Sequence, residues 1–238
     1  MARTTKPDGE KLLLAVERLI EDTDELISRT EVFQRAAGIV AGREDADKVT
    51  AAAEMIIRSY SNRSAATGAL TALPSVVPGA GMLVAAIGGT LLDIGLMLKH
   101  EIEMVLCLAH LHGYDITRQD ERRMVFLLAS MNVSEVQQGG NFLLDVAVAE
   151  MDAIVHYTPR QVTKMLASIL TRLALRATSR GLWRAVPLAG IVACGLMNKW
   201  FTGEVGHRCN SLLEQRRNME RNQSTHTEAD VVDARVRS

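Results

Sequence analysis

The residues of this chain best suited to chemistry lie on one predicted helix near its middle. His100, Glu103, Cys107 and His110 are spaced three, four and three residues apart. At about 100° per residue, they fall within roughly an 80° arc of the helix surface. Imidazole, carboxylate and thiolate groups all bind zinc or iron, so this arc is the candidate metal site.

Two features of the same helix weigh against a metal. Neighbouring members of the arc lie a turn apart along the axis, so one straight helix rarely supplies four ligands to one ion. The helix also lacks the HExxH and ExxH motifs, because Met104 and Leu106 stand where a histidine is needed. We therefore expect no cofactor and a solvated polar face. The opposite face is apolar and consists of Ile94, Leu98, Ile102, Val105 and Ala109.

Neither enzyme motifs nor net charge indicate a catalytic or nucleic-acid-binding protein. The chain has no phosphate-binding loop, nucleophile elbow or dinucleotide fingerprint. Its 27 basic and 28 acidic residues give a net charge of -1, which makes no overall case for nucleic acid. A local basic cluster suits anionic lipid or nucleic acid, but Glu214 and Glu220 lie between its members and favour a solvated helix end. This cluster consists of Arg208, Arg216, Arg217 and Arg221.

The composition predicts a single all-α domain of about eight helices. Hydrophobic residues reach 47% of the chain but aromatic residues only 4%, and abundant Ala and Leu favour helix over sheet. Three cysteines without a CxxC pair fit a reducing cytoplasm, and the polar start shows no secretory signal. We expect a polar lead over 1–9, the helical domain over 10–216 and a disordered polar tail over 217–238.

Helical spacing and breaker residues set the predicted helices. One covers Glu10–Ser28, a short one contains the GxxxG step Gly38–Gly42, and a third covers Asp45–Tyr60. The GxxxG step indicates close helix packing. Another helix begins after Pro78 and ends near Leu111, with Gly113 as a left-handed cap.

Two stretches about a hundred residues apart have nearly the same sequence. Residues 77–85 and 186–194 are both apolar and rich in small residues, and each opens with a proline and is followed by a lysine. Such segments indicate helices that pack backbone to backbone or helices that meet a membrane. We interpret each segment as part of a Pro-led, glycine-rich helical hairpin. The positions that define these hairpins are Pro78, Gly81, Gly88, Asp93, Gly95, Pro187 and Gly190.

The first stretch is only marginally suited to crossing a bilayer. Residues 79–98 have the necessary length, and eight Leu, Ile and Val residues contribute roughly −2.4 to −4.8 kcal/mol to insertion. Asp93 near the centre costs about +2.5 to +3.5 kcal/mol, so the sum is near zero. A buried helical hairpin is the favoured structure, in which Asp93 pairs with Lys164 or Arg172. The alternative is a hairpin that opens onto the membrane.

Several short segments resemble one bacterial family. Ala65-Ala66-Thr67-Gly68 before a Pro-containing apolar helix, followed by a helix ending in His112-Gly113-Tyr114-Asp115, is similar to the EcsC family. The segment from Gly181 to Gly190, reaching Asn198, resembles its C-terminal basic-Pro-Gly-Asn signature. The resemblance covers roughly residues 45 to 210. It implies a bacterial helical protein in the cytoplasm or at the membrane, and it supplies no catalytic residues.

These features predict a non-enzymatic accessory protein of the bacterial cytoplasm, peripheral to or partly inserted in the inner membrane. Its partners are membrane lipid or a membrane protein complex, and the glycine-rich hairpin moves between a buried and a lipid-facing state. That motion requires Asp93 to leave its ion partner, so acid or anionic lipid favours the exposed form. One alternative is a soluble scaffold with the glycine-rich helices as core and a protein partner bound on the 100–110 face. The third is a metal-dependent enzyme that uses that face.

Overall fold

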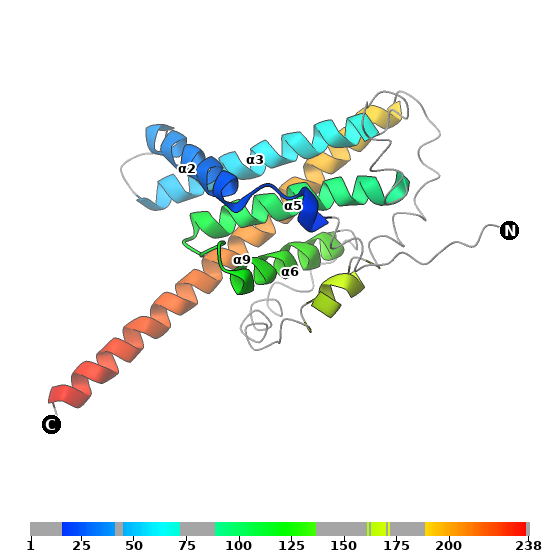
Figure 1. The fold of residues 1–238 in the computed structure, drawn as a ribbon. Coiled ribbons are helices and arrows are strands. Elements are labelled where there is room, and N and C mark those ends of the chain that lie inside the picture. Colours follow the sequence, from blue (N-terminus) through cyan, green and yellow to red (C-terminus); the bar gives the residue numbers. More distant parts are fainter. Residues whose placement is uncertain are drawn as a thin grey trace.

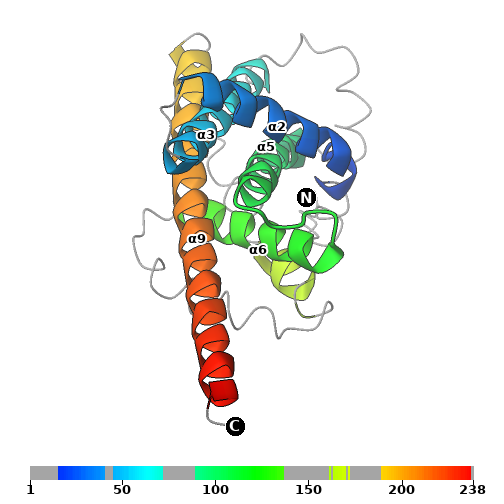
Figure 2. The ribbon, with the colours of Figure 1, turned by 90° about the vertical axis from the view of Figure 1, so that its left-hand side faces the viewer.

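The computed structural model describes residues 16–40, 45–71, 89–136, 161, 163–169, 171 and 189–236. All regular secondary structure within these residues is helical, which confirms the all-α prediction (Figure 1). Helices α2, α3, α6 and α9 pack around α5, which takes the centre of the bundle (Figure 2).

The N-terminal part of the bundle is divided differently from the sequence prediction. Residues 16–19 are helical, and this helical turn ends at Ile20. Helix α2 then covers Thr23–Val40. Asp22 provides the break, because its carbonyl accepts from the Leu26 amide and its carboxylate accepts from the Asp24 amide at 3.3 Å. A side chain that accepts from a free amide of the first turn is an N-cap, and it fixes where the helix begins.

Helix α3 covers Asp45–Thr71 and α5 covers Gly89–Leu111. α3 begins where predicted but continues past Tyr60, because no proline stops it before Pro74. α5 ends as predicted, with Gly113 at a φ of 89°. The Tyr114 amide donates to the Ala109 carbonyl and the Gly113 amide to the His110 carbonyl, the hydrogen-bond pair of a Schellman cap.

The buried residues of α5 show why it lies at the centre. Every side chain from Glu101 to Ala109 is buried, so this helix has no solvent-facing side along those residues. A helix that is covered all round needs neighbours on each face. α2, α3, α6 and α9 supply those neighbours.

Helix α6 covers Gln119–Val136 and packs on α5 and α9. Asp120 and Glu121 lie in its first turn, where acidic side chains interact favourably with the positive end of the helix dipole. The Thr117 hydroxyl, just before the helix, donates to Asp115 at 2.6 Å. Residues 163–169 are also helical, and Leu166 is buried against the core.

Helix α9 covers Ala189–Val236, which corrects the prediction for the end of the chain. Residues 217–238 were expected to be disordered, yet helix continues through this stretch to Val236. No glycine or proline interrupts the sequence after Gly206. Extending an existing helix costs no new nucleus, so a polar sequence continues it without a core to bury.

The two helices that follow the repeated segments run side by side in the same direction. α5 and α9 begin at the same end of the bundle, where α3 ends (Figure 1). Glu101 contacts Thr202 near the start of this interface, and His112 contacts Asn210 near its end. Contacts that advance together along both chains identify a parallel pair, whereas α3 runs the opposite way.

Candidate functional site

The outer face of α9 near its start carries an exposed apolar cluster. Leu196, Met197 and Trp200, here called the α9 patch, are 63%, 67% and 65% exposed. They lie within roughly a 100° arc of the helix. The exposed Lys199 lies beside them.

The opposite face of the same helix explains why the patch points outward. Thr202, Val205 and Cys209 are fully buried against the bundle. The Asn198 side-chain amide donates to the Ser64 carbonyl of α3 at 3.5 Å. These contacts fix the rotation of α9, so the patch has to face away from the core.

The predicted polar face of α5 is buried rather than solvated, which corrects the sequence analysis. Glu103 and Cys107 have no exposed surface, and His100 and His110 are half-buried. A polar arc on one helix normally indicates a water-facing side. Here α2 and α3 supply polar partners that cover it. Glu103 and Cys107 are therefore covered by other parts of the chain, and the binding of a protein partner on the 100–110 face stays a prediction.

An ion-pair network surrounds Glu103. Its carboxylate accepts from the Lys99 ammonium at 2.6 Å and from the Glu21 amide at 2.9 Å. Lys99 also lies 3.8 Å from the Glu21 carboxylate, which pairs with the Arg29 guanidinium. Burial raises the pKa of Glu21, but the hydrogen bond and charge of Arg29 outweigh it and hold the pKa below its usual value. The network ties the segment before α2 to the central helix.

Two other members of the predicted metal site, His100 and Cys107, contact side chains of α3. The His100 imidazole lies 3.0 Å from the Thr67 hydroxyl, and burial lowers its pKa to about 4. The Cys107 thiol lies 3.6 Å from the Tyr60 hydroxyl, and burial raises the pKa of that thiol. Within the described ranges, no three His, Cys, Asp or Glu side chains are arranged to hold a metal ion.

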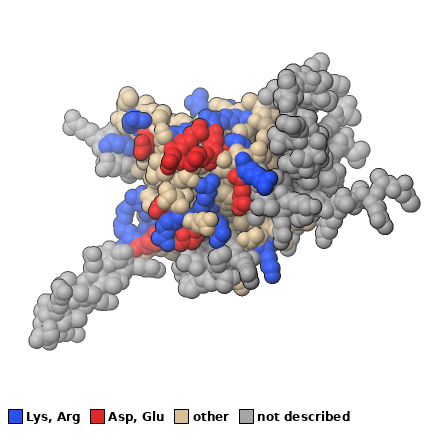
Figure 3. All heavy atoms as spheres, in the orientation of Figure 1, with Lys and Arg blue, Asp and Glu red and all other residues tan. Residues whose placement is uncertain are grey.

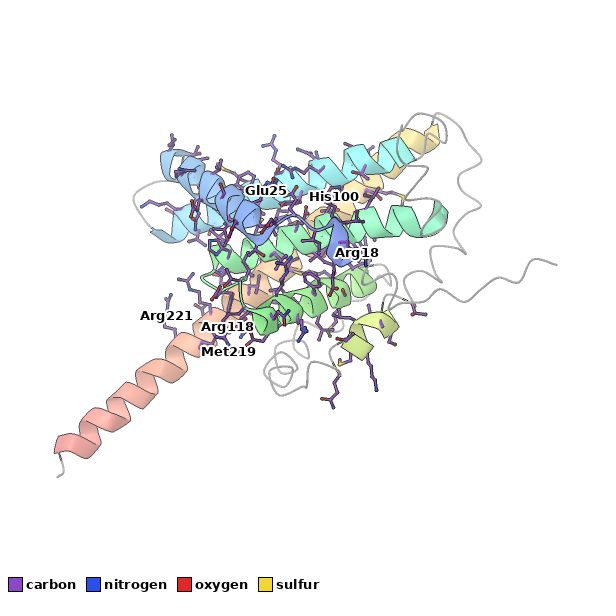
Figure 4. The ribbon with its side chains drawn as sticks, in the orientation of Figure 1. Arg18, Glu25, His100, Arg118, Met219 and Arg221 are labelled. Carbon is purple, nitrogen blue, oxygen red and sulfur yellow. The ribbon has the colours of Figure 1, made fainter. Side chains whose placement is uncertain are left out.

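The acidic side chains of the N-terminal segment gather on one visible face of the molecule. Figure 3 shows them over the start of α2, with basic side chains around them. Glu25 points outward there (Figure 4) and pairs with Arg29 one turn later at 3.2 Å. Because Glu25 is mostly exposed, this pair contributes little to stability.

Part of the basic cluster at the far end of α9 is occupied by structural contacts. The Arg216 guanidinium lies 4.6 Å from the centre of the Tyr114 ring, 2.8 Å from Glu220 and 3.5 Å from Glu121 of α6. Figure 4 shows Arg118, Met219 and Arg221 where α9 leaves the bundle. Arg216 thus anchors α9 to α6 rather than offering a free charge.

Much of the predicted hairpin lies outside the described residues. This holds for Pro78, Gly81, Gly88, Pro187 and Arg172 and for the side chain of Asp93. Lys164 is described and exposed. The pairing of Asp93 with Lys164 or Arg172 therefore stays a prediction.

Of the glycines whose surroundings the structure describes, the most closely packed is Gly206, which the sequence patterns do not single out. A Cβ at Gly206 of α9 would lie 2.9 Å from Ile57 Cγ1 and 3.0 Å from Met104 Sδ. A Cβ at Gly95, one of the predicted hairpin positions, would meet only Leu19 at 3.9 Å, an ordinary contact. Gly38 of the GxxxG step has open space around it. The sequence signal for this contact is the short spacing of Gly203 and Gly206.

Comparison with known proteins adds no assignment. No protein-family model matches the sequence, and neither a curated protein nor a solved structure matches it. Among the residues that the structure describes, no helix is both long enough and apolar enough to cross a bilayer.

Proposed function

We propose that this protein is a non-enzymatic accessory protein that associates with a membrane surface through the α9 patch. The observation that carries the proposal is the exposure of Leu196, Met197 and Trp200 on one helix face beside Lys199. A tryptophan and aliphatic side chains next to a lysine form the usual combination of a helix that lies at the headgroup level of a bilayer.

The position of the patch in the chain supports the same function. The patch follows the second Pro-led segment, and α9 begins at the end of the bundle where α5 also begins and α3 ends (Figure 1). A bilayer in contact with this end would therefore meet the α9 patch close to the flanks of both repeated segments. Partial insertion of the 79–98 hairpin would extend this contact.

The expected strength of the contact follows from the exposed side chains. Complete burial of a Leu, Met or similar side chain contributes about 1.5–3 kcal/mol. Each patch residue is about two-thirds exposed, so the three together have about 3–6 kcal/mol available for binding. That energy corresponds to roughly a hundredfold to ten-thousandfold in partitioning.

Vesicle flotation tests the proposal. The purified chain is mixed with vesicles of two compositions. One is neutral phosphatidylcholine. The other contains about 30% anionic phosphatidylglycerol, which adds a negative surface potential. The α9 variant replaces Leu196, Met197 and Trp200 with serine. We expect the native chain to float with the vesicles and the variant to lose most of that binding.

A second apolar cluster on this chain supplies the matched control. Val32, Ile39 and Val40 of α2 are 51%, 86% and 73% exposed, so replacing them with serine removes a comparable apolar surface elsewhere. This control variant should bind vesicles as the native chain does. Equal losses in both variants, or no flotation of the native chain with either vesicle, would contradict the proposal.

A further inference from the structure

A buried polar layer lies where α3, α5 and α9 meet. At Gly206 of α9, Ile57 of α3 and Met104 of α5 come together. One turn away, the same faces of α3 and α5 carry Ser61 and Glu101. The layer next to this apolar contact is therefore built from a hydroxyl and a carboxyl group.

The contacts of α9 close this polar layer, which consists of Ser61, Glu101, Thr202 and Gly203. The Thr202 hydroxyl donates to Glu101 Oε1 at 2.6 Å. The Ser61 Oγ atom lies 3.6 Å from the point where a Cβ of Gly203 would stand. Glu101 and Thr202 have no exposed surface, and Ser61 has 4%. Among the described residues, Glu101 Oε2 and Ser61 Oγ find no hydrogen-bond partner.

No cationic side chain of the described residues pairs with Glu101, in contrast to Glu103 on the same helix. A buried carboxylate with one hydrogen bond and no counter-ion is costly, and such a group keeps its proton instead. Burial raises the pKa of Glu101 to about 8, against a smaller lowering from the Thr202 hydrogen bond.

The groups that the other helices contribute near this layer do not compete with Glu101 as the titrating group. α9 adds the Cys209 thiol, whose pKa is raised well above its ordinary value by burial and by Glu101. α3 adds the hydroxyls of Ser61 and Ser64. The buried stretch 124–133 of α6 has no titratable side chain. On α5 itself, the His100 imidazole lies 3.0 Å from the Thr67 hydroxyl of α3.

We propose that Glu101 is a proton-binding site that couples the seating of α9 to pH. The neutral acid accepts from Thr202 inside the polar layer while α9 is seated. When α9 lifts from α5 and α3, Glu101 reaches water, its O–H bond breaks, and the proton passes to a water molecule. Glu101 therefore takes up one proton when α9 packs against α5 and α3. When α9 separates from them, that proton returns to solvent.

The direction of the pH dependence follows from the two pKa values. The exposed carboxyl has an ordinary pKa of 4.5 and the buried one about 8. Below the lower value, both states hold the proton and pH has no effect through this group. Between them, only the seated state holds it, so opening becomes easier by about tenfold per pH unit. Above the higher value both states are ionised, and the dependence levels off.

Amide hydrogen exchange of the full chain at matched pH values tests this coupling, with Glu101→Gln as the first variant. Glutamine keeps the shape and an acceptor for Thr202 but cannot titrate. Intrinsic exchange rates are the same in both proteins, so the native-to-variant ratio for amides of residues 198–213 isolates the opening of α9. We expect this ratio to rise by about tenfold per pH unit from pH 5 to pH 8 and then to level off. A ratio that is constant with pH overturns the proposal.

A second variant keeps the test decisive if Glu101→Gln does not fold. Thr202→Val removes the hydrogen bond that lowers the pKa of Glu101, so the pH at which opening levels off should move upward. An unmoved plateau overturns the assignment to Glu101. Neither measurement uses a membrane, so the result is independent of vesicle binding by the α9 patch.

Discussion

Substitution of Gly206 by alanine tests how closely α9 packs on the core. The new Cβ would lie 2.9 and 3.0 Å from two carbons of Ile57 and 3.0 Å from the sulfur of Met104. Both neighbours are buried, with 3% and 0% exposure, so neither moves away into solvent. Overpacking of this kind costs about 1–3 kcal/mol.

Helix propensity acts in the opposite direction and sets the net effect. Alanine is about 1 kcal/mol more favourable than glycine in a helix interior. The free energy of unfolding of Gly206→Ala should therefore fall by about 0–2 kcal/mol. Gly203→Ala is the matched control, because its nearest neighbour is Ser61 Oγ at an ordinary 3.6 Å. That variant keeps the propensity gain and should be more stable than the native chain by up to about 1 kcal/mol.

Urea unfolding followed by far-ultraviolet circular dichroism measures both variants. The two should differ by about 1–3 kcal/mol, with Gly203→Ala the more stable. In the double variant with Ile57→Ala, the cost of Gly206→Ala should shrink, since space is restored at the contact. Equal stabilisation by both glycine substitutions would refute the close contact between α9, α3 and α5.

The remaining predictions concern a cap, an imidazole and two thiols. Asp22→Ala should lower the free energy of unfolding by about 1 kcal/mol in a urea titration, with Asp22→Ser much closer to the native value, because the side chain caps α2. His100, with a pKa of about 4, should show no imidazole titration by NMR between pH 8 and 5.5. Its ordinary pKa of 6.5 belongs to the unfolded chain, so this group makes the fold less stable as pH falls from 6.5 towards 4. Cys107 and Cys209 are buried with raised pKa values, so iodoacetamide at pH 8 should label them only after denaturation, as peptide mass spectrometry would show.

Helix-forming sequence and local breakers were sufficient to predict the helical class and several ends. Gly113 ends α5 because only a residue that tolerates positive φ completes the cap there, and this signal is local. The break at Asp22 was missed, because the apolar spacing from Leu13 to Ile27 continues through it. The end of the chain was assigned to disorder because it lacks apolar residues, a criterion that does not account for extension of an existing helix.

The candidate sites also combine features that the sequence predicts with features that only the packing of the helices shows. His100, Glu103 and Cys107 share one face of α5, as their spacing predicts, but spacing cannot tell water from a polar neighbour. Lys99 lies one turn from Glu103 on α5, but Glu21 contacts Glu103 from a distant part of the chain. Burial of a polar arc depends on which helices surround it, and that information is not local.

The sequence by itself determined that this chain is helical, where α5 ends, and that two similar Pro-led segments precede two of its helices. Those properties follow from backbone preferences and apolar periodicity, which act over a few neighbouring residues. Only the tertiary structure decided that α5 is central, that Glu101 is buried with no cationic partner among the described residues, and that Leu196 and Trp200 face outward. Burial and ion pairing depend on the packing of helices that are distant in the sequence, so the same side chain is solvated in one arrangement and enclosed in another.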